Sequence, residues 1–185
     1  METGYLLRVE DIPFEGRELV FSLERSQIEG RVSSVNENLK GQSIAYPDYT
    51  LVNEPVCKFR LQREGKDVLL DGEISVEFST ACSRCLEETE RKSITKVRQT
   101  LKPLAEKGKI KEQPSITFYQ SDEIDFRDVA EEAVVMGLPA VVVCSDDCRG
   151  LCSGCGENLN SSVCSCQAPD IVDERWAALK NIKLS

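Results

Sequence analysis

Alternating apolar and polar residues predict a β-rich body in the first part of the chain. In residues 57–61 every second side chain is apolar, and residues 70–78 repeat this alternation over a longer stretch. The segment 64–66 between them contains a glycine and is typical of a hairpin turn. A further β-like stretch spans residues 94–101, and a shorter strand piece lies at residues 19–21. We therefore expect antiparallel strands that are buried on one face.

Helical periodicity is clear at one place. Apolar residues recur at positions i, i+3, i+4 and i+7 from Phe126 to Val134, with carboxylates on the opposite face. Asp125 directly before them is a natural N-cap, and Gly137 followed by Pro139 predicts the end. We expect one amphipathic helix here. A second, short helix is expected to begin at Asp173.

The amino-acid composition adds two facts to the predicted secondary structure: many cysteines and no histidine. The 185 residues include nine cysteines and no histidine. The first residues lack a signal-peptide pattern, and no apolar run approaches the roughly 18 residues that span a bilayer, so we expect a cytoplasmic protein without membrane contact. In a reducing compartment clustered cysteines are metal ligands more often than disulfides. Without histidine, a zinc site must be built from cysteine, and histidine-based catalysis is excluded.

Eight of the nine cysteines have the spacing of zinc ligands. Two short chelating pairs per ion satisfy the four-coordinate preference of zinc. The favoured grouping joins the pair at residues 82 and 85 to residues 144 and 148, and forms a second site from residues 152–166. A partition that mixes ligands of the two sets is also compatible with the spacing. The expected ligands are Cys82, Cys85, Cys144, Cys148, Cys152, Cys155, Cys164 and Cys166, for two zinc ions.

Other interpretations of the cysteines are weaker. The spacing of Cys148, Cys152 and Cys155 matches radical iron–sulfur enzymes, but only thirty residues follow it, too few for their barrel. Cys57 lies on an apolar strand face and is expected in the core.

The alternative function for the cysteine clusters is a thiol-based redox-switched zinc chaperone or sensor. Closed four-sulfur sites favour structural zinc, and we expect neither enzymatic activity nor a small-molecule substrate.

These elements together predict an α+β protein. We expect an antiparallel β-rich body with one amphipathic helix and a zinc-stapled C-terminal module. Residues 1–121 would form the β-rich body, including the first Cys-x2-Cys knuckle. Residues 122–185 would contain the helix and the six-cysteine zinc-binding module.

Charge limits the ways in which this chain can contact nucleic acid. The formal net charge is −9, and a broad basic surface would not give such a value. Basic residues nevertheless outnumber acidic ones from Arg84 to Lys111, whereas carboxylates dominate from Glu112 to Asp147. This asymmetry is compatible with two solvated faces of opposite sign, or with a local basic patch for phosphate.

The C-terminal half contains several distinctive motifs. They are Cys82-Ser83-Arg84-Cys85-Leu86-Glu87, Gly137-Leu138-Pro139 and a long signature from Cys148 to Asn160, followed by Cys164-Ser165-Cys166. In these motifs the chain resembles the YceD-like family of large ribosomal RNA accumulation proteins. Residues 173–180 are similar to the end of the family, although Glu174 stands where proline is usual. Residues before Cys82 share only general β character with it.

The resemblance implies a function that spacing and composition do not. It implies a non-enzymatic factor that supports 23S ribosomal RNA accumulation and large-subunit biogenesis, with pre-ribosomal RNA or a large-subunit ribosomal protein as partner. Possible nucleic-acid contacts are Arg84, Arg91 and Lys92 beside the first knuckle and Arg149 beside the second. Each of these four can equally be a solvated surface charge.

Overall fold

The protein is built around one long, twisted antiparallel sheet. The computed structural model describes residues 4–38, 47–109, 111 and 113–166, so the helix expected from Asp173 lies outside the described residues. The elements in chain order are β1 (Leu6–Arg8), the 3-10 helix η1 (Val9–Asp11), β2 (Arg17–Ser22), α1 (Arg25–Asn38), β3 (Thr50–Leu51), β4 (Val56–Glu64), β5 (Asp67–Ala81), β6 (Glu88–Pro103), the 3-10 helix η2 (Leu104–Glu106), β7 (Ile116–Tyr119), β8 (Glu123–Asp125) and α2 (Phe126–Gly137).

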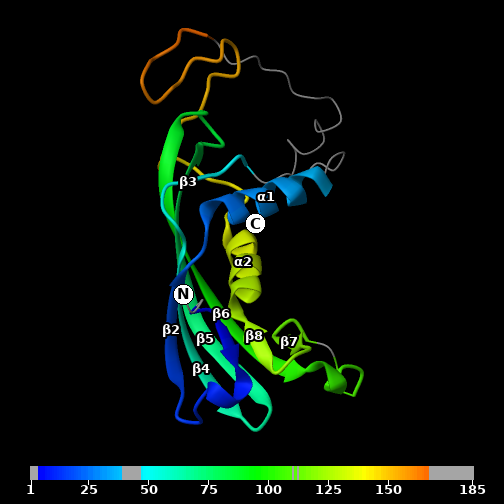
Figure 1. Cartoon of the computed structure of the whole chain (residues 1–185). Coiled ribbons are helices and arrows are strands. Elements are labelled where there is room, and N and C mark those ends of the chain that lie inside the picture. The colour runs from blue at the N-terminus through cyan, green and yellow to red at the C-terminus, as the bar shows by residue number, and fades with distance from the viewer. Residues whose placement is uncertain (1–3, 39–46, 110, 112, 167–185) are drawn as a thin grey trace, which may run out of the picture.

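The main sheet has the strand order β2-β4-β5-β6-β7, and β3 pairs with β5 beyond the end of β4. All pairs are antiparallel except β6 with β7, which are parallel. The predicted hairpin is confirmed, because β4 and β5 are joined at Gly65, whose φ of 66° suits glycine in a tight turn. Strands β5 and β6 extend together past the ends of β2 and β4 and form an arm, along which β3 pairs with β5 (Figure 1).

The hydrophobic core lies between one face of this sheet and the two helices. Alternate residues of β4 and β5 are buried, as the sequence pattern predicts. Helix α2 packs across β5 and β6, and α1 packs against α2 (Figure 1). Fully buried core side chains include Phe59, Leu61, Leu70, Ile74, Phe78 and Phe126.

Helices α1 and α2 differ in how well they can be predicted from the sequence. Helix α2 is confirmed together with its N-cap, since the Asp125 carboxylate accepts a hydrogen bond from the Arg127 N–H at 2.9 Å. Helix α1 was not predicted, so the described residues contain two α-helices where the sequence predicted one. Only Ile28 and Val32 of α1 are buried, which leaves too few apolar positions for a visible helical period. The α+β class itself is confirmed.

The segment C-terminal to residue 121 contacts the body directly. Strand β8 pairs with β1 near the N-terminus, and α2 packs on β6 and β5. None of the helices in the described part of the chain is long and apolar enough to cross a membrane. The cysteine-rich segment 144–166 lies beyond the tip of the β5–β6 arm (Figure 1).

Candidate metal centres

The first cysteine pair forms the turn that connects β5 to β6. Cys82 and Cys85 follow the last residue of β5, and the chain re-enters the sheet at Glu88. Two backbone hydrogen bonds close the turn: Leu86 N–H donates to the Cys82 carbonyl at 2.9 Å, and Cys82 N–H donates to the Glu87 carbonyl at 2.8 Å. Leu86 adopts a φ of 62°, the left-handed conformation that lets the turn fold back. Both sulfur atoms are thereby fixed at the end of a rigid arm.

The segment after α2 brings two more cysteines to this turn. The sulfur atoms of Cys82, Cys85, Cys144 and Cys148 lie within 4.8 Å of one another. The separations of Cys82 from Cys148 and of Cys85 from Cys144 are 3.8 and 3.6 Å. A tetrahedron with metal–sulfur bonds of about 2.3 Å has edges of about 3.8 Å, so the distances suit a metal ion. This set, which we call the inner tetrad, ties the β arm to a segment some 60 residues later in the chain.

Two arginines hold the loops that carry the inner tetrad. The Arg84 guanidinium donates to the carbonyl of Cys148 at 3.1 Å. The Arg91 guanidinium, on β6, donates to the carbonyl of Val143 at 2.7 Å and also to that of Cys144. These carbonyls belong to an irregular segment that has no strand partner to satisfy them. Arg84 and Arg91 therefore stabilise the loops that carry the inner tetrad.

The remaining cysteines form a second set, which we call the outer tetrad. Cys152, Cys155, Cys164 and Cys166 place their sulfur atoms within 4.8 Å of one another. The loop turns at Cys152, whose N–H donates to the Glu157 carbonyl at 2.8 Å and whose sulfur accepts from the Gly154 N–H at 3.4 Å. Unlike the inner tetrad, this set includes two exposed cysteines, Cys155 and Cys166.

The electrostatics of both tetrads suit a divalent cation. Burial opposes ionisation of Cys82, but backbone N–H groups of Cys85, Arg84 and Cys144 point at its sulfur and lower its pKa to about 6. The N–H groups of Cys155 and Gly154 likewise lower the pKa of Cys152 to about 6. A second thiolate beside the first is unfavourable, and in the outer tetrad a hydrogen bond with Cys155 and its charge raise the pKa of Cys166 to about 12. A bound cation removes this repulsion.

One residue that contacts the inner tetrad, Asn160, was not identified as part of the site from the sequence. The Asn160 side-chain amide donates to the Cys148 sulfur at 3.4 Å, and its carbonyl oxygen accepts from the Arg149 N–H at 2.8 Å. Asn160 thus connects the outer loop to an inner ligand. Asn160 is the last residue of the Cys148–Asn160 signature, and this position in the motif was the only sequence signal of its role. Cys57, by contrast, lies in the core at 0% exposure, as predicted.

The four basic residues that were predicted to contact RNA lie close to the cysteines but in different environments. Arg84 and Arg91 bind loop carbonyls, as described above. Lys92 forms an ion pair with Glu77 on β5 at 3.0 Å. Arg149 is exposed, and its side chain has no hydrogen-bond or ion-pair partner among residues 4–38, 47–109, 111 and 113–166. Three of the four thus have an intramolecular partner, and only Arg149 has none among the described residues.

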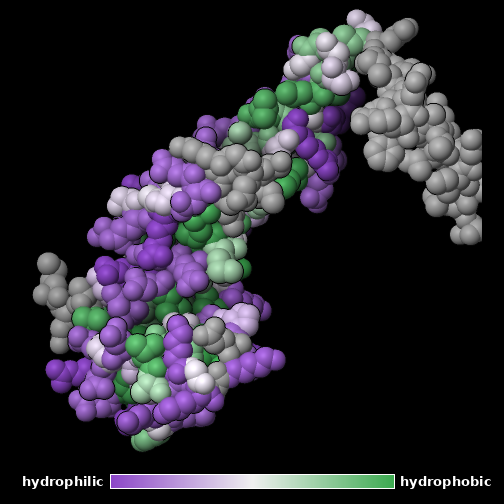
Figure 2. All heavy atoms as spheres, turned by 90° about the vertical axis from the view of Figure 1, so that its right-hand side faces the viewer, coloured by the Kyte–Doolittle hydropathy of each residue, from purple (hydrophilic) through white to green (hydrophobic). Residues whose placement is uncertain are grey.

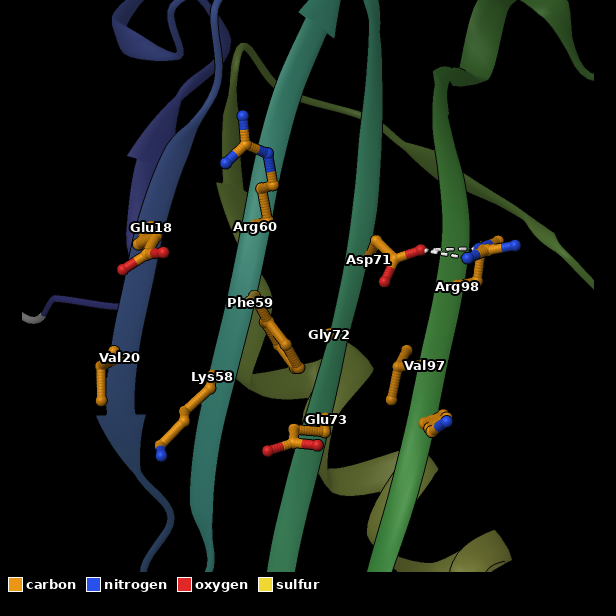
Figure 3. Close-up of a pocket in the computed structure, with 11 residues that line it drawn as sticks. Glu18, Val20, Lys58, Phe59, Arg60, Asp71, Gly72, Glu73, Val97 and Arg98 are labelled. Carbon is orange, nitrogen blue, oxygen red and sulfur yellow. Dashed lines mark hydrogen bonds and ion pairs between the residues drawn. The ribbon is translucent and has the colours of Figure 1, made fainter.

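A hollow of about 650 Å³ lies on the sheet face opposite the helices, over β2, β4, β5 and β6 (Figure 3). Cationic and acidic side chains alternate across it from strand to strand, and Asp71 forms an ion pair with Arg98 at 2.6 Å. Lys58 and Glu73 face the same hollow. Opposite charges on neighbouring strands stabilise an exposed sheet face, which accounts for this arrangement without a ligand.

Comparison with known proteins places these sites in a family. An uncharacterised protein of Mycobacterium bovis and one of Mycobacterium tuberculosis are each 27% identical over 121 residues, which cover 65% of this chain and 58% of the relative. An uncharacterised Mycobacterium leprae protein is 27% identical over 124 residues, 66% of this chain and 56% of its own length. The chain thus spans less than two thirds of these relatives. No solved structure matches it.

The family match covers both tetrads. Residues 70–183 match the family described as large ribosomal RNA subunit accumulation protein YceD, and this range contains all eight tetrad cysteines. The match extends over more than half of the chain. It begins within β5 and includes β6, α2 and the cysteine-rich segment. The chain belongs to the YceD family of large ribosomal RNA subunit accumulation proteins.

Proposed function

We propose that this protein is a non-enzymatic, zinc-binding factor that supports accumulation of 23S ribosomal RNA and assembly of the large ribosomal subunit. The observation that carries the proposal is the family match, which contains both tetrads. The proposed partner is pre-ribosomal RNA or a large-subunit ribosomal protein. The metal would act structurally, because four protein ligands leave no open coordination position for a substrate or a reactive water.

The chemistry of the ligands supports zinc at both tetrads. Four thiolates suit zinc or iron–sulfur clusters, and the separations of 3.6 and 3.8 Å in the inner tetrad suit a single ion. Zinc there would hold the β arm to the segment after α2. We expect purified protein to be colourless and to contain two zinc ions per chain by elemental mass spectrometry. A brown protein with iron and inorganic sulfide would refute the assignment.

Depletion in the native host tests the role in ribosome assembly. Loss of the protein should lower 23S RNA relative to 16S RNA and reduce large subunits in sucrose gradients. A Cys82→Ser/Cys85→Ser gene should fail to restore 23S RNA, because the inner metal is lost. A Cys57→Ala gene serves as the matched control, since it removes a cysteine that belongs to neither tetrad. Normal 23S levels after complete depletion would contradict the proposal.

The exposed cysteines of the outer tetrad favour one second candidate, a thiol-based redox sensor. Cys155 and Cys166 are accessible to oxidants, whereas three ligands of the inner tetrad are buried. A sensor would release zinc from the outer tetrad at low peroxide and expose apolar surface as a result. Retention of both metal ions and of the fold, measured with a zinc indicator dye and circular dichroism, would eliminate this candidate.

A further inference from the structure

A lysine-rich protrusion follows β6 at the end of the sheet remote from the cysteines (Figure 1). Lys107, Lys109 and Lys111 lie here within five positions, and all three are exposed. None of them forms an ion pair with another residue that the structure describes. Lys102, at the base of the protrusion, differs because it pairs with Asp67. Three ammonium groups are thus presented together to solvent.

An aromatic ring lies beside these lysines. A hollow of about 440 Å³ is lined by Lys107, Gln113, Pro114, Ile116 and Phe118. The Lys107 ammonium lies 6.0 Å from the centroid of the Phe118 ring, within the range of a cation–π contact. Phe118 belongs to β7, the last strand of the sheet, which pairs only with β6 among the described residues. A ring face, one ammonium group and an open strand edge therefore meet at one hollow, and Lys109 and Lys111 follow close by in the chain.

The opposite end of the molecule has the reverse charge. Six carboxylates surround the tetrads, and none forms an ion pair within the described part of the chain: Glu87, Glu88, Glu90, Asp146, Asp147 and Glu157. Two of the three nearby arginines are bound to loop carbonyls. Four thiolates around a divalent ion would add a net negative charge at each tetrad. A polyanion is repelled there and attracted to the lysines, so the two ends are suited to different partners.

Surface character agrees with this division. The lower part of the molecule in Figure 2 is mostly hydrophilic, with small hydrophobic patches among the polar side chains. In the narrow upper part, hydrophobic atoms are exposed along the side turned to the viewer (Figure 2). Val141 and Val163, before and within the cysteine-rich segment, are 70% and 89% exposed.

We propose that Lys107, Lys109, Lys111 and Phe118 form a binding site for single-stranded RNA. The ammonium groups contact phosphates, and the ring stacks with a base, which is the combination that binds unpaired nucleic acid with little sequence preference. The site deepens the proposed function, on which the choice of RNA as the polyanion rests. It also explains how a chain with a net charge of −9 can bind RNA, because the contact is confined to one protrusion.

Fluorescence anisotropy with labelled oligouridylate and oligoadenylate of roughly 12 nucleotides tests the site on the full chain. Three phosphate contacts predict a slope of about −2 in a plot of log affinity against log salt concentration. The variant Lys107→Gln/Lys109→Gln/Lys111→Gln should bind about tenfold or more weakly at low salt and lose most of this slope. No binding of either oligonucleotide by the wild type would overturn the proposal.

The matched control removes the same charge elsewhere. Arg17→Gln/Lys58→Gln/Lys96→Gln neutralises three exposed cationic residues of the sheet and should keep wild-type affinity. An equal loss in this control would overturn the site, since net charge alone would then decide binding. Circular dichroism verifies that both variants are folded.

Phe118→Leu separates RNA from an acidic protein segment as the ligand. It keeps an apolar side chain but removes stacking, so oligonucleotide affinity should fall about tenfold while binding of polyglutamate stays unchanged. Unchanged RNA affinity, or an equal loss for polyglutamate, would overturn the proposal in favour of a purely electrostatic site. These measurements need no cellular phenotype. If RNA binding depends on these four residues but 23S levels stay normal after depletion, the proposed cellular role is refuted and the binding site stands.

Discussion

Cys57 shows how burial alone decides the behaviour of a cysteine. Its side chain lies on β4 at 0% exposure, and burial raises its pKa to about 12. An unfolded thiol ionises near pH 9, so folding favours the protonated form. The resulting stabilisation is complete below pH 9 and is lost as the pH rises from 9 to 12. Cys57 should resist thiol reagents under native conditions.

Replacing Cys57 tests this pH dependence. Cys57→Ala should lower the free energy of unfolding by about 1–2 kcal/mol at neutral pH, because a buried group is removed. The difference from the wild type should shrink between pH 9 and 12, as the wild type loses the contribution of its thiol. Urea unfolding followed by far-ultraviolet circular dichroism measures both. A constant difference across this pH range would contradict the burial argument.

At the level of elements, the close approach of α2 to β6 depends on Gly137. A Cβ atom at this position would lie 1.9 Å from the Thr95 hydroxyl oxygen. Gly137→Ala should therefore push the end of α2 away from the sheet and cost about 1–3 kcal/mol of stability in urea unfolding. Gly30→Ala in α1 is the matched control, because nothing lies within 4 Å of its Cβ and alanine favours helix. The control should be neutral or stabilising.

Helix α1 is held to α2 by an ion pair with a buried carboxylate. Glu131 is only 6% exposed, and its carboxylate lies 2.5 Å from the Arg31 guanidinium. Arg31→Gln should destabilise the protein by about 1–3 kcal/mol, since the buried carboxylate loses its closer partner and keeps only Arg127 at 3.9 Å. Adding Glu131→Gln should recover part of this loss in a double-mutant cycle. Strict additivity of the two single changes would show that the pair contributes nothing.

The same two helices show what the sequence can predict and what it cannot. The apolar period and N-cap of α2 are local signals, and so is the alternation in β4 and β5. Helix α1 carries few such signals, because it is fixed by contacts with distant residues such as Glu131. The tetrads were predictable since chelating pairs are short in sequence. The roles of Arg84 and Arg91 were not, because loop carbonyls that need donors appear only in three dimensions.

At the scale of the whole molecule, the two tetrads differ in what they connect. The inner tetrad joins the tip of the β5–β6 arm to the segment after α2, whereas the outer tetrad closes only residues 152–166. Closing the long connection restricts the unfolded chain and is worth about 4 kcal/mol by analogy with a covalent cross-link. The outer loop is shorter and includes exposed ligands, so a chelator should reach it first.

Equivalent substitutions in the two tetrads should therefore have unequal effects. Cys166→Ser should reduce the zinc content from two ions to one while the sheet keeps its circular dichroism and its stability in urea. Cys82→Ser should also remove one ion, but it should lower the free energy of unfolding by about 4 kcal/mol, because the arm and the segment after α2 are no longer joined. Elemental mass spectrometry and urea unfolding give the two readouts. Equal destabilisation by both substitutions would mean that the inner site does not join distant parts of the chain.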